Sequence, residues 1–460
     1  MLAQQKTAGL CNGRVGSRQQ LCQPHRLASR ALCCPKASQQ QQPVHEPQQS
    51  WLSKVALGLA TAGMIGSTMM EFAPPVDARA LLASDPVKNA NALLRYALPI
   101  DNKPIREIQG ELESITKALR VPGSKSLGPV AKAIKKSQNI LTKQRSKIEA
   151  DFAPGKEETG KQALDDLGRS LSEFTVIVDA KDKQAVPDKQ RECLQYVGAA
   201  EEAMVKGMPF EVPKEYANLP QLLGRATLEM KINCGNGPEG RTDEVLTIVL
   251  DGYNAPVSAG AFLDLVERGF YNGMEIQRAD GFVVQTGDPD GPGPEEGFRD
   301  PKTGEVRTVP LEVRVEGDKE PLYEFSMQDV GRTTEAPVLP FNAYGTLAWA
   351  RNEFENNSAS SQVFFLLKES ELTPTGANLL DGRFAVFGYV TEDSDAVGYM
   401  QVGDKIDYIK VKKIDGEFLN GPESAPAPAP KAEEPAVAPA SEQPAEQPAI
   451  APADAPAEQQ

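Results

Sequence analysis

The sequence predicts a multidomain α + β protein, in which an N-terminal helical bundle precedes a β domain of many short strands. The chain has 460 residues, which is too long for one ordinary core. Apolar residues recur at helical spacing up to about residue 206, and beyond residue 224 they alternate as in strands. We expect six segments: 1–50 and 51–80 as a two-part leader, 81–206 as the bundle, 207–224 as a linker, 225–418 as a barrel and 421–460 as a disordered tail.

The leader has the composition of an organelle address. No acidic residue occurs from Met1 to His45, which is typical of a chloroplast transit peptide. From Trp51 to Met70 a mostly apolar run follows, and an Ala-x-Ala site ends at Ala80. The run is short for a membrane span, so we expect cleavage near Ala80 and no stable membrane anchor afterwards. Such a two-step address predicts delivery to the thylakoid lumen.

Charge and residue usage exclude several classes of function. The net charge is −15, which makes nucleic acid a poor partner. Both histidines, His25 and His45, lie in the leader, so the mature chain can form neither a histidine-based nucleophilic site nor an ordinary zinc site. Cys193 and Cys234 could pair or could be small buried side chains. We expect no cofactor and no metal.

Glycines between two predicted strands match the dinucleotide-binding pattern on paper. They form Gly235-x-Gly237-x-x-Gly240. That pattern requires a helix directly after the glycines, whereas residues 241–250 are expected to form a strand. A glycine-rich hairpin turn accounts for the same residues.

Helical starts and stripes follow one another in the first domain. Asp85-Pro86 is predicted to begin a helix that ends near Leu98, and Pro104 to begin the next one. The 3-4-3-4 spacing of apolar residues marks the later helical stripes, among them Ile105, Ile108, Leu112, Ile115 and Leu119, and Leu164, Leu167, Leu171, Phe174 and Val178. These stripes are expected to form the core of a bundle; the alternative is a docking surface for a partner.

The second domain begins after a proline-punctuated linker, which we place at Gly207 to Leu223. A helix is expected from Pro256 to Arg268, closed by Gly269. Strands are expected around residues 228–232, 245–250, 275–286, 345–350, 362–367 and 383–390. Many strands and few helices favour a closed barrel or a sandwich.

Three ordered sequence blocks resemble the cyclophilin family of prolyl isomerases. They are Asp280-Gly281-Phe282-Val283-Val284-Gln285-Thr286-Gly287-Asp288, Ser361-Gln362-Val363-Phe364-Phe365 and Leu380-Asp381-Gly382-Arg383-Phe384-Ala385-Val386-Phe387-Gly388. The family's usual first block is Pro-Gly-Phe-x-x-Gln-Gly-Gly-Asp. The resemblance covers residues 226–417 and implies an eight-stranded antiparallel β-barrel capped by two helices.

The resemblance also implies the residues of a peptide-binding site. Phe282 and Phe364 match the aromatic residues of the proline pocket, and Gln285 matches the glutamine that binds the substrate backbone. Further positions of the site are Ala350, Arg351, Gln362, Leu379, Leu380 and Phe384. The family's catalytic arginine aligns with Gln277, so Gln277 is the catalytic candidate. Arg278 follows one position later, where strand alternation predicts that it points to the opposite face.

Together with the lumenal address and the helical domain, the chain is similar to the large thylakoid-lumen cyclophilins of plants and green algae. That similarity implies a role in photosystem II assembly and maintenance. We expect binding of proline-containing or extended lumenal segments of photosystem II proteins, weak or absent isomerase activity, and contact between the helical and barrel domains. The alternatives are an active prolyl isomerase, and a bundle that docks a partner while the barrel serves as scaffold.

Overall fold

The computed structural model describes residues 86–120, 122–123, 127–233, 243–288, 297–368 and 378–422. The leader with its cleavage site, Cys234, the glycines at 235–240 and the tail lie outside the described residues. Within the described ranges no helix is both long and apolar enough to span a membrane.

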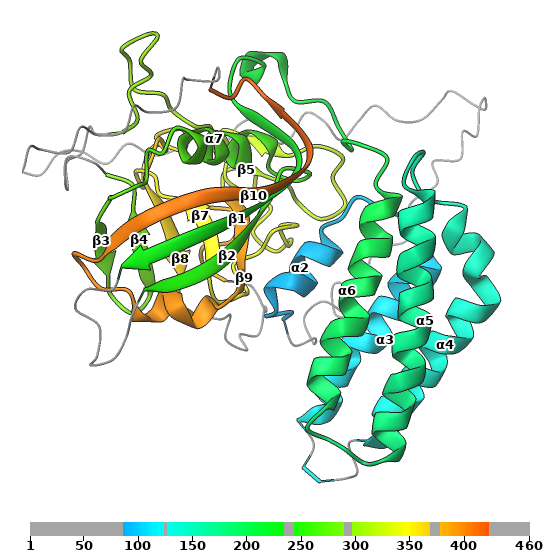
Figure 1. Ribbon diagram of the computed structural model, residues 1–460. Helices are drawn as coiled ribbons and strands as arrows, with labels where there is room; N and C mark the ends of the chain where they lie inside the picture. The colour runs from blue at the N-terminus through cyan, green and yellow to red at the C-terminus, as the bar shows by residue number, and fades with distance from the viewer. Residues whose placement is uncertain are drawn as a thin grey trace, which may run out of the picture. The chain divides into compact units, whose positions relative to one another are not determined.

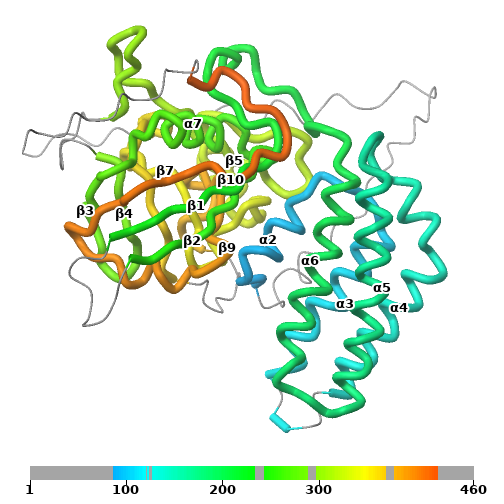
Figure 2. Tube along the Cα trace, viewed as in Figure 1, coloured from blue at the N-terminus to red at the C-terminus, as the bar shows by residue number. Residues whose placement is uncertain are grey.

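Four helices form the bundle (Figures 1 and 2): α3 (Lys103–Leu119), α4 (Leu127–Glu149), α5 (Glu157–Asp179) and α6 (Val186–Met204). Each helix packs against two of the others, in the cyclic order α3, α4, α5, α6. Asn102 caps α3 by accepting a hydrogen bond from the Ile105 backbone N–H, with Pro104 in the first turn. The predicted apolar stripes belong to one common cluster, in which all of their named residues except the partly buried Leu119 are buried, as expected for a bundle core.

Helix α2 (Ala90–Tyr96) is shorter than predicted. It begins after Asn89, whose side chain accepts from the Ala92 N–H, and not at Asp85-Pro86. Its buried face belongs to the hydrophobic cluster of the β domain, through Leu93 and Leu94. This first helical segment therefore packs with the β domain and outside the bundle core.

The β domain is an eight-stranded antiparallel sheet with the strand order β10-β1-β2-β9-β7-β8-β4-β3 (Figure 1). Its strands are β1 (Gln221–Asn233), β2 (Glu244–Asp251), β3 (Ile276–Ala279), β4 (Val283–Thr286), β7 (Thr346–Trp349), β8 (Val363–Leu366), β9 (Val386–Glu392) and β10 (Lys405–Leu419). The Ile276 N–H donates to Asp404 O, and a bridge joins Glu275 to Lys405, so the two outer strands meet. The predicted eight-stranded antiparallel barrel is confirmed.

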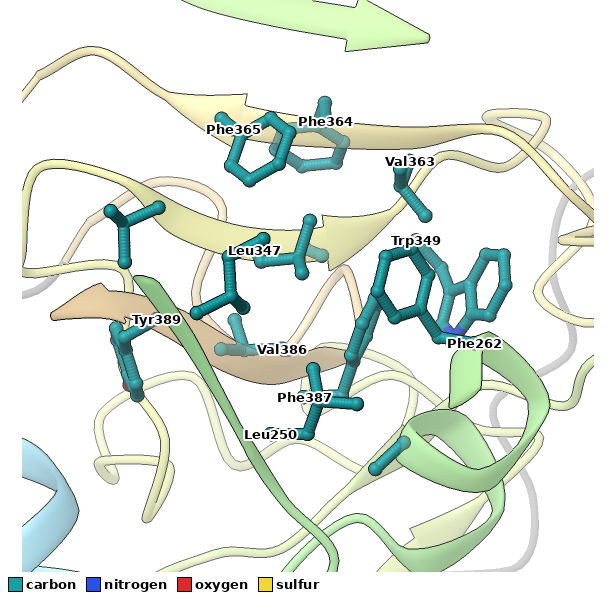
Figure 3. Close-up of a cluster of buried hydrophobic side chains, with 14 of the residues drawn as sticks. Leu250, Phe262, Leu347, Trp349, Val363, Phe364, Phe365, Val386, Phe387 and Tyr389 are labelled. Carbon is teal, nitrogen blue, oxygen red and sulfur yellow. The ribbon is translucent and has the colours of Figure 1, made fainter. Parts of the chain in front are cut away.

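Aromatic side chains fill the interior of the barrel (Figure 3). Trp349, Phe262 and Phe387 pack with ring centroids 5.2–6.3 Å apart, the range in which aromatic pairs attract. Phe262 comes from α7 (Pro256–Glu267), the predicted cap, and a short 3₁₀ helix, η3 (Ser394–Tyr399), packs near β2. The described interior of the barrel is therefore packed with side chains, which leaves its outer surface for binding a peptide.

Several boundaries differ from the sequence prediction. Strand β1 begins at Gln221, inside the predicted linker, which also contains the 3₁₀ turn η2 (Lys214–Tyr216). The predicted strand at 275–286 is two strands, β3 and β4, joined by a turn. A short hairpin, β5 (Glu312–Val313) with β6 (Leu322–Tyr323), lies in a region without a strand prediction. Cys193 is a buried free thiol.

Candidate active site

A cleft of about 450 Å³ opens on the outer surface of the barrel. Strands β3, β4 and β8 contribute to its wall, and the β3–β4 turn, the loop between β7 and β8 and the loop that precedes β9 complete it. The lining consists of Arg278, Phe282, Val283, Gln285, Ala350, Arg351, Asn352, Glu355, Ser358, Ser360, Ser361, Gln362, Phe364, Leu380 and Phe384. Apolar and polar side chains share this lining, as in sites that bind a ligand in a fixed orientation.

Strand register aligns three of these side chains. Arg278 on β3 lies opposite Gln285 on β4, and Gln285 lies opposite Phe364 on β8. Directly opposed residues of antiparallel strands point to the same face of the sheet. A cationic donor, an amide and an aromatic ring therefore follow one another across the wall of the cleft.

A β-bulge at Gln277 produces this alignment. Ile276 pairs with Thr286 and Arg278 with Gln285, so two steps along β3 match one step along β4, and Gln277 is the extra residue. The expectation that Arg278 points away from the site is therefore wrong. Strand alternation predicts the opposite face only while the ladder is regular.

Gln277 does not contribute to the lining of the cleft. Its side-chain amide donates to the backbone carbonyl of Asp288 at 2.5 Å, and its buried Oε1 has no hydrogen-bond partner among the described residues. The residue that aligns with the family's arginine is thus turned toward the backbone that follows β4. Its neighbour, Arg278, is the basic side chain that β3 presents to the cleft.

The floor of the cleft is aromatic. Phe364 is 5 % exposed, stacks on Phe341 at 5.8 Å between ring centroids, and meets Phe384 edge to face at 5.5 Å. Phe282 is 38 % exposed, so part of its ring is open to a ligand. An apolar wall of this kind can hold a proline ring by burial.

An amide network lies beside the floor. The Gln285 amide donates to Gln362 Oε1 at 2.6 Å, and the Gln362 amide donates to Asp288 Oδ2 at 3.1 Å. Each amide group carries both a donor and an acceptor end. This network fixes the orientation of Gln285 and leaves it further capacity to bind a peptide backbone.

Arg351 occupies another side of the cleft. Its guanidinium lies 5.1 Å from the centroid of the Phe384 ring and donates to the carbonyls of Arg383, Asn352 and Glu353. Desolvation lowers the pKa of Arg351, although an arginine stays charged near neutral pH. These contacts fix Arg351 against the loop after β7 and the loop before β9, so its side chain forms part of the wall of the cleft.

Asp280, in the turn between β3 and β4, binds Arg278. The Arg278 Nε and Nη2 atoms both donate to Asp280 Oδ2, at 2.8 and 2.5 Å. The other carboxylate oxygen accepts from the backbone N–H groups of Phe282 and Val283, at 2.9 Å each. The Val283 N–H and these further donors lower the pKa of Asp280 to about 2, so the carboxylate is ionised at neutral and mildly acidic pH.

Most of the predicted peptide-binding residues line this cleft. They are Phe282, Gln285, Ala350, Arg351, Gln362, Phe364, Leu380 and Phe384. Leu379 is 86 % exposed and is not part of the lining. Sequence reasoning did not assign Val283, Ser361 and the polar loop residues Asn352, Glu355, Ser358 and Ser360 to the site. Val283 and Ser361 lie inside the quoted motif blocks, which was the available signal for them; the other loop residues have no periodicity that could identify them.

This arrangement suits chemistry without a nucleophile. A prolyl peptide bond rotates over a barrier of about 18–20 kcal/mol that arises from amide resonance. A donor that binds the twisted amide more strongly than the planar one lowers that barrier. Among the described residues no cluster of three or more His, Cys, Asp or Glu side chains could hold a metal ion.

Two family models match the chain. Residues 89–205 match the PsbQ-like domain of peptidyl-prolyl cis-trans isomerases like CYP38. Residues 239–415 match the cyclophilin-type peptidyl-prolyl cis-trans isomerase domain. The two matches cover the bundle with helix α2, and most of the barrel, in the predicted order.

Curated relatives match most of the chain. The chain is 52 % identical over 335 residues to the chloroplastic peptidyl-prolyl cis-trans isomerase CYP38 of Arabidopsis thaliana, an alignment that covers 73 % of this chain and 76 % of the relative. It is 40 % identical over 375 residues to a putative thylakoid lumen peptidyl-prolyl cis-trans isomerase of Synechocystis, covering 81 % and 95 %.

A third relative, the chloroplastic peptidyl-prolyl cis-trans isomerase CYP37 of Arabidopsis thaliana, is 32 % identical over 340 residues, covering 70 % of this chain and 69 % of the relative. The chloroplastic and thylakoid-lumen relatives confirm the predicted location. The chain therefore belongs to the cyclophilin-type peptidyl-prolyl cis-trans isomerases, in the group that carries a helical PsbQ-like domain before the barrel.

Proposed function

We propose that this protein binds extended, proline-containing segments of lumenal proteins in the barrel cleft and has weak prolyl isomerase activity. The alignment of Arg278, Gln285 and Phe364 across three strands carries the proposal. Phe364 supplies an apolar surface for the proline ring, Gln285 a hydrogen bond to the peptide backbone, and Arg278 a donor for the twisted amide. Gln277 is assigned a place in the bulge and no catalytic contact.

The proposed activity is weak because the donor is poorly organised. The Arg278 side chain is 53 % exposed, and its Nε and Nη2 donors are occupied by Asp280. A donor contributes most to catalysis when it is fixed beforehand and shielded from water. We propose lumenal segments of photosystem II membrane proteins as clients, which the protein would assist in assembly and maintenance.

A second candidate is a fully active prolyl isomerase that accelerates folding of lumenal proteins. The presence of Arg278 in the cleft favours it, since a charge-assisted hydrogen bond is roughly twice as strong as a neutral one. The two candidates share one binding site. They differ in whether Arg278 reaches the prolyl nitrogen in most of the bound complexes.

Binding and isomerisation should be measured on the same full chain. A fluorescein-labelled Ala-Ala-Pro-Ala peptide is titrated beside an Ala-Ala-Ala-Ala control, and isomerisation of an Ala-Pro substrate is followed by a protease-coupled assay. We expect saturable binding that depends on proline and a slow but measurable catalysed rate. Equal binding of both peptides, or no binding of either, would contradict the proposal. A rate comparable with that of efficient cyclophilins would favour the second candidate.

A further inference from the structure

The turn between β3 and β4 contains a carboxylate where the family's usual motif has proline. Asp280 precedes Gly281-Phe282 in the position of the first residue of Pro-Gly-Phe. A proline at that position offers no carboxylate to a neighbouring side chain. Asp280 therefore adds contacts to the turn that the usual motif lacks.

We propose that Asp280 is a positioning residue that holds the Arg278 guanidinium at the turn and so limits its contact with a bound prolyl peptide. This inference rests on the function proposed above, because it concerns regulation of the donor in the same cleft. Asp280 is not a catalytic residue in this account. It acts through Arg278.

The two oxygens of Asp280 have separate tasks. Oδ1 accepts from the N–H groups of Phe282 and Val283 and holds the turn. Oδ2 accepts from Nε and Nη2 of Arg278. Asparagine at this position can keep the first set of bonds through its carbonyl oxygen, but it cannot form the ion pair. Asp280→Asn therefore removes the ion pair with Arg278 while it keeps the hydrogen bonds of the turn.

The ion pair competes directly with a peptide for the arginine. Its bonds use Nε and Nη2, and a guanidinium held in this way cannot turn the same atoms toward a prolyl nitrogen. Gln277 offers no substitute, because its amide donates to the Asp288 carbonyl. Productive complexes that use these donors are then the fraction in which Arg278 has left Asp280.

The solvent exposure of the Arg278–Asp280 ion pair determines how strongly the pair can limit the release of Arg278. The two side chains are 53 % and 40 % exposed, and exposed ion pairs contribute little to stability. An interaction of that strength changes the population of the released arginine by about two- to five-fold. It should also weaken as salt screens the two charges.

The test compares Asp280→Asn with the unaltered full chain, measuring kcat/KM on an Ala-Pro substrate and the Kd of the labelled proline peptide. We expect kcat/KM to rise about two- to five-fold at low salt while Kd changes little, since the released donor acts on the twisted amide. Adding Arg278→Ala to Asp280→Asn should remove the gain. Asp280→Ala also loses the hydrogen bonds to Oδ1 and should be less stable. Comparing it with Asp280→Asn distinguishes the effect of a weakened turn from the effect of releasing Arg278.

A salt titration tests the inference without any variant. From about 0.02 M to about 1 M NaCl, the rate of the unaltered chain should rise toward that of Asp280→Asn, whose rate should change less. An unchanged or lower rate in Asp280→Asn with peptide binding intact would overturn the inference and leave the proposed function standing. A gain that persists without Arg278 would also overturn it. Loss of proline-dependent binding already in the unaltered chain would overturn both.

Discussion

The floor of the cleft lies on β8, which pairs with a strand on each side, whereas its donor side lies on β3, which pairs with β4 and meets the start of β10 only near Ile276. Phe364 on β8 is 5 % exposed and contacts two aromatic rings. Arg278 on β3 has a half-exposed side chain, and its direction depends on one extra residue in a four-residue strand. Core packing thus determines where the aromatic floor lies, and local strand register determines where Arg278 lies.

The largest effect is expected from Phe364→Ala, which removes the floor. Loss of a buried phenylalanine should lower the free energy of unfolding by about 3–5 kcal/mol and abolish binding of the proline peptide. Val363→Ala is the matched control, because Val363 is equally buried on the same strand and faces the interior. It should lower stability but keep peptide affinity, as measured by urea unfolding and fluorescence titration. Equal loss of affinity in both variants would contradict the assignment of the floor.

The floor and the donor side of the cleft should also contribute differently to how the stability of the protein depends on pH. Asp381, beside the floor, accepts from the Phe341 and Asn378 N–H groups, and desolvation raises its pKa from 3.8 to about 6. A raised pKa means that the folded state holds the proton more strongly. The resulting stability is present below the unfolded pKa and is lost as the pH rises through about 6.

Relative to Asp381→Asn, the unaltered chain should therefore lose on the order of 2 kcal/mol of unfolding free energy between about pH 4 and about pH 6. Asp280→Asn is the control, since the lowered pKa of Asp280 gives a contribution that is present above 3.8 and is lost only as the pH falls toward about 2. Urea unfolding at several pH values measures both. Parallel pH profiles for Asp381→Asn and the unaltered chain would refute this prediction.

Gln277→Arg tests the donor side with a smaller expected effect. Sequence alignment alone predicts that an arginine here restores the family's catalyst. Because the Gln277 side chain faces the Asp288 carbonyl and is partly buried, we expect no gain in rate and a loss of about 1–2 kcal/mol in unfolding free energy. Gln277→Ala controls for loss of the glutamine contacts. A several-fold rise in isomerisation rate in Gln277→Arg would show that the extra residue of β3 is misassigned.

The same contrast explains what could be predicted from the sequence. Phe364, Leu380 and Phe384 line the cleft, and they could be singled out from the sequence because they belong to the motif blocks. Strand alternation predicted the wrong one of Gln277 and Arg278 at the cleft, because a bulge is a property of the pairing between two strands and leaves no mark in a single strand's alternation. Leu379 matched by alignment, but its side chain is exposed and does not line the cleft, although that of its neighbour Leu380 does.

The sequence predicted neither the start of helix α2 nor strand β10 correctly. The helix expected at Asp85-Pro86 begins after Asn89, because Asn89 provides the capping acceptor for the Ala92 N–H. Strand β10 was not predicted as an element, since its many lysines and acids weaken the alternation. Strand β10 is stabilised by its long-range pairing with β1 over thirteen residues, and not by a strong strand preference of its own sequence.

The most direct test of the account is the isomerisation rate of Arg278→Ala beside that of Gln277→Ala, each measured with peptide affinity on the full chain. The account predicts that Arg278→Ala lowers the catalysed rate about tenfold or to the uncatalysed level, with little change in affinity, because a charge-assisted donor is lost. Gln277→Ala should keep most of the rate. The opposite result, an intact rate without Arg278 and a lost rate without Gln277, would contradict the assignment of the donor to the residue after the bulge.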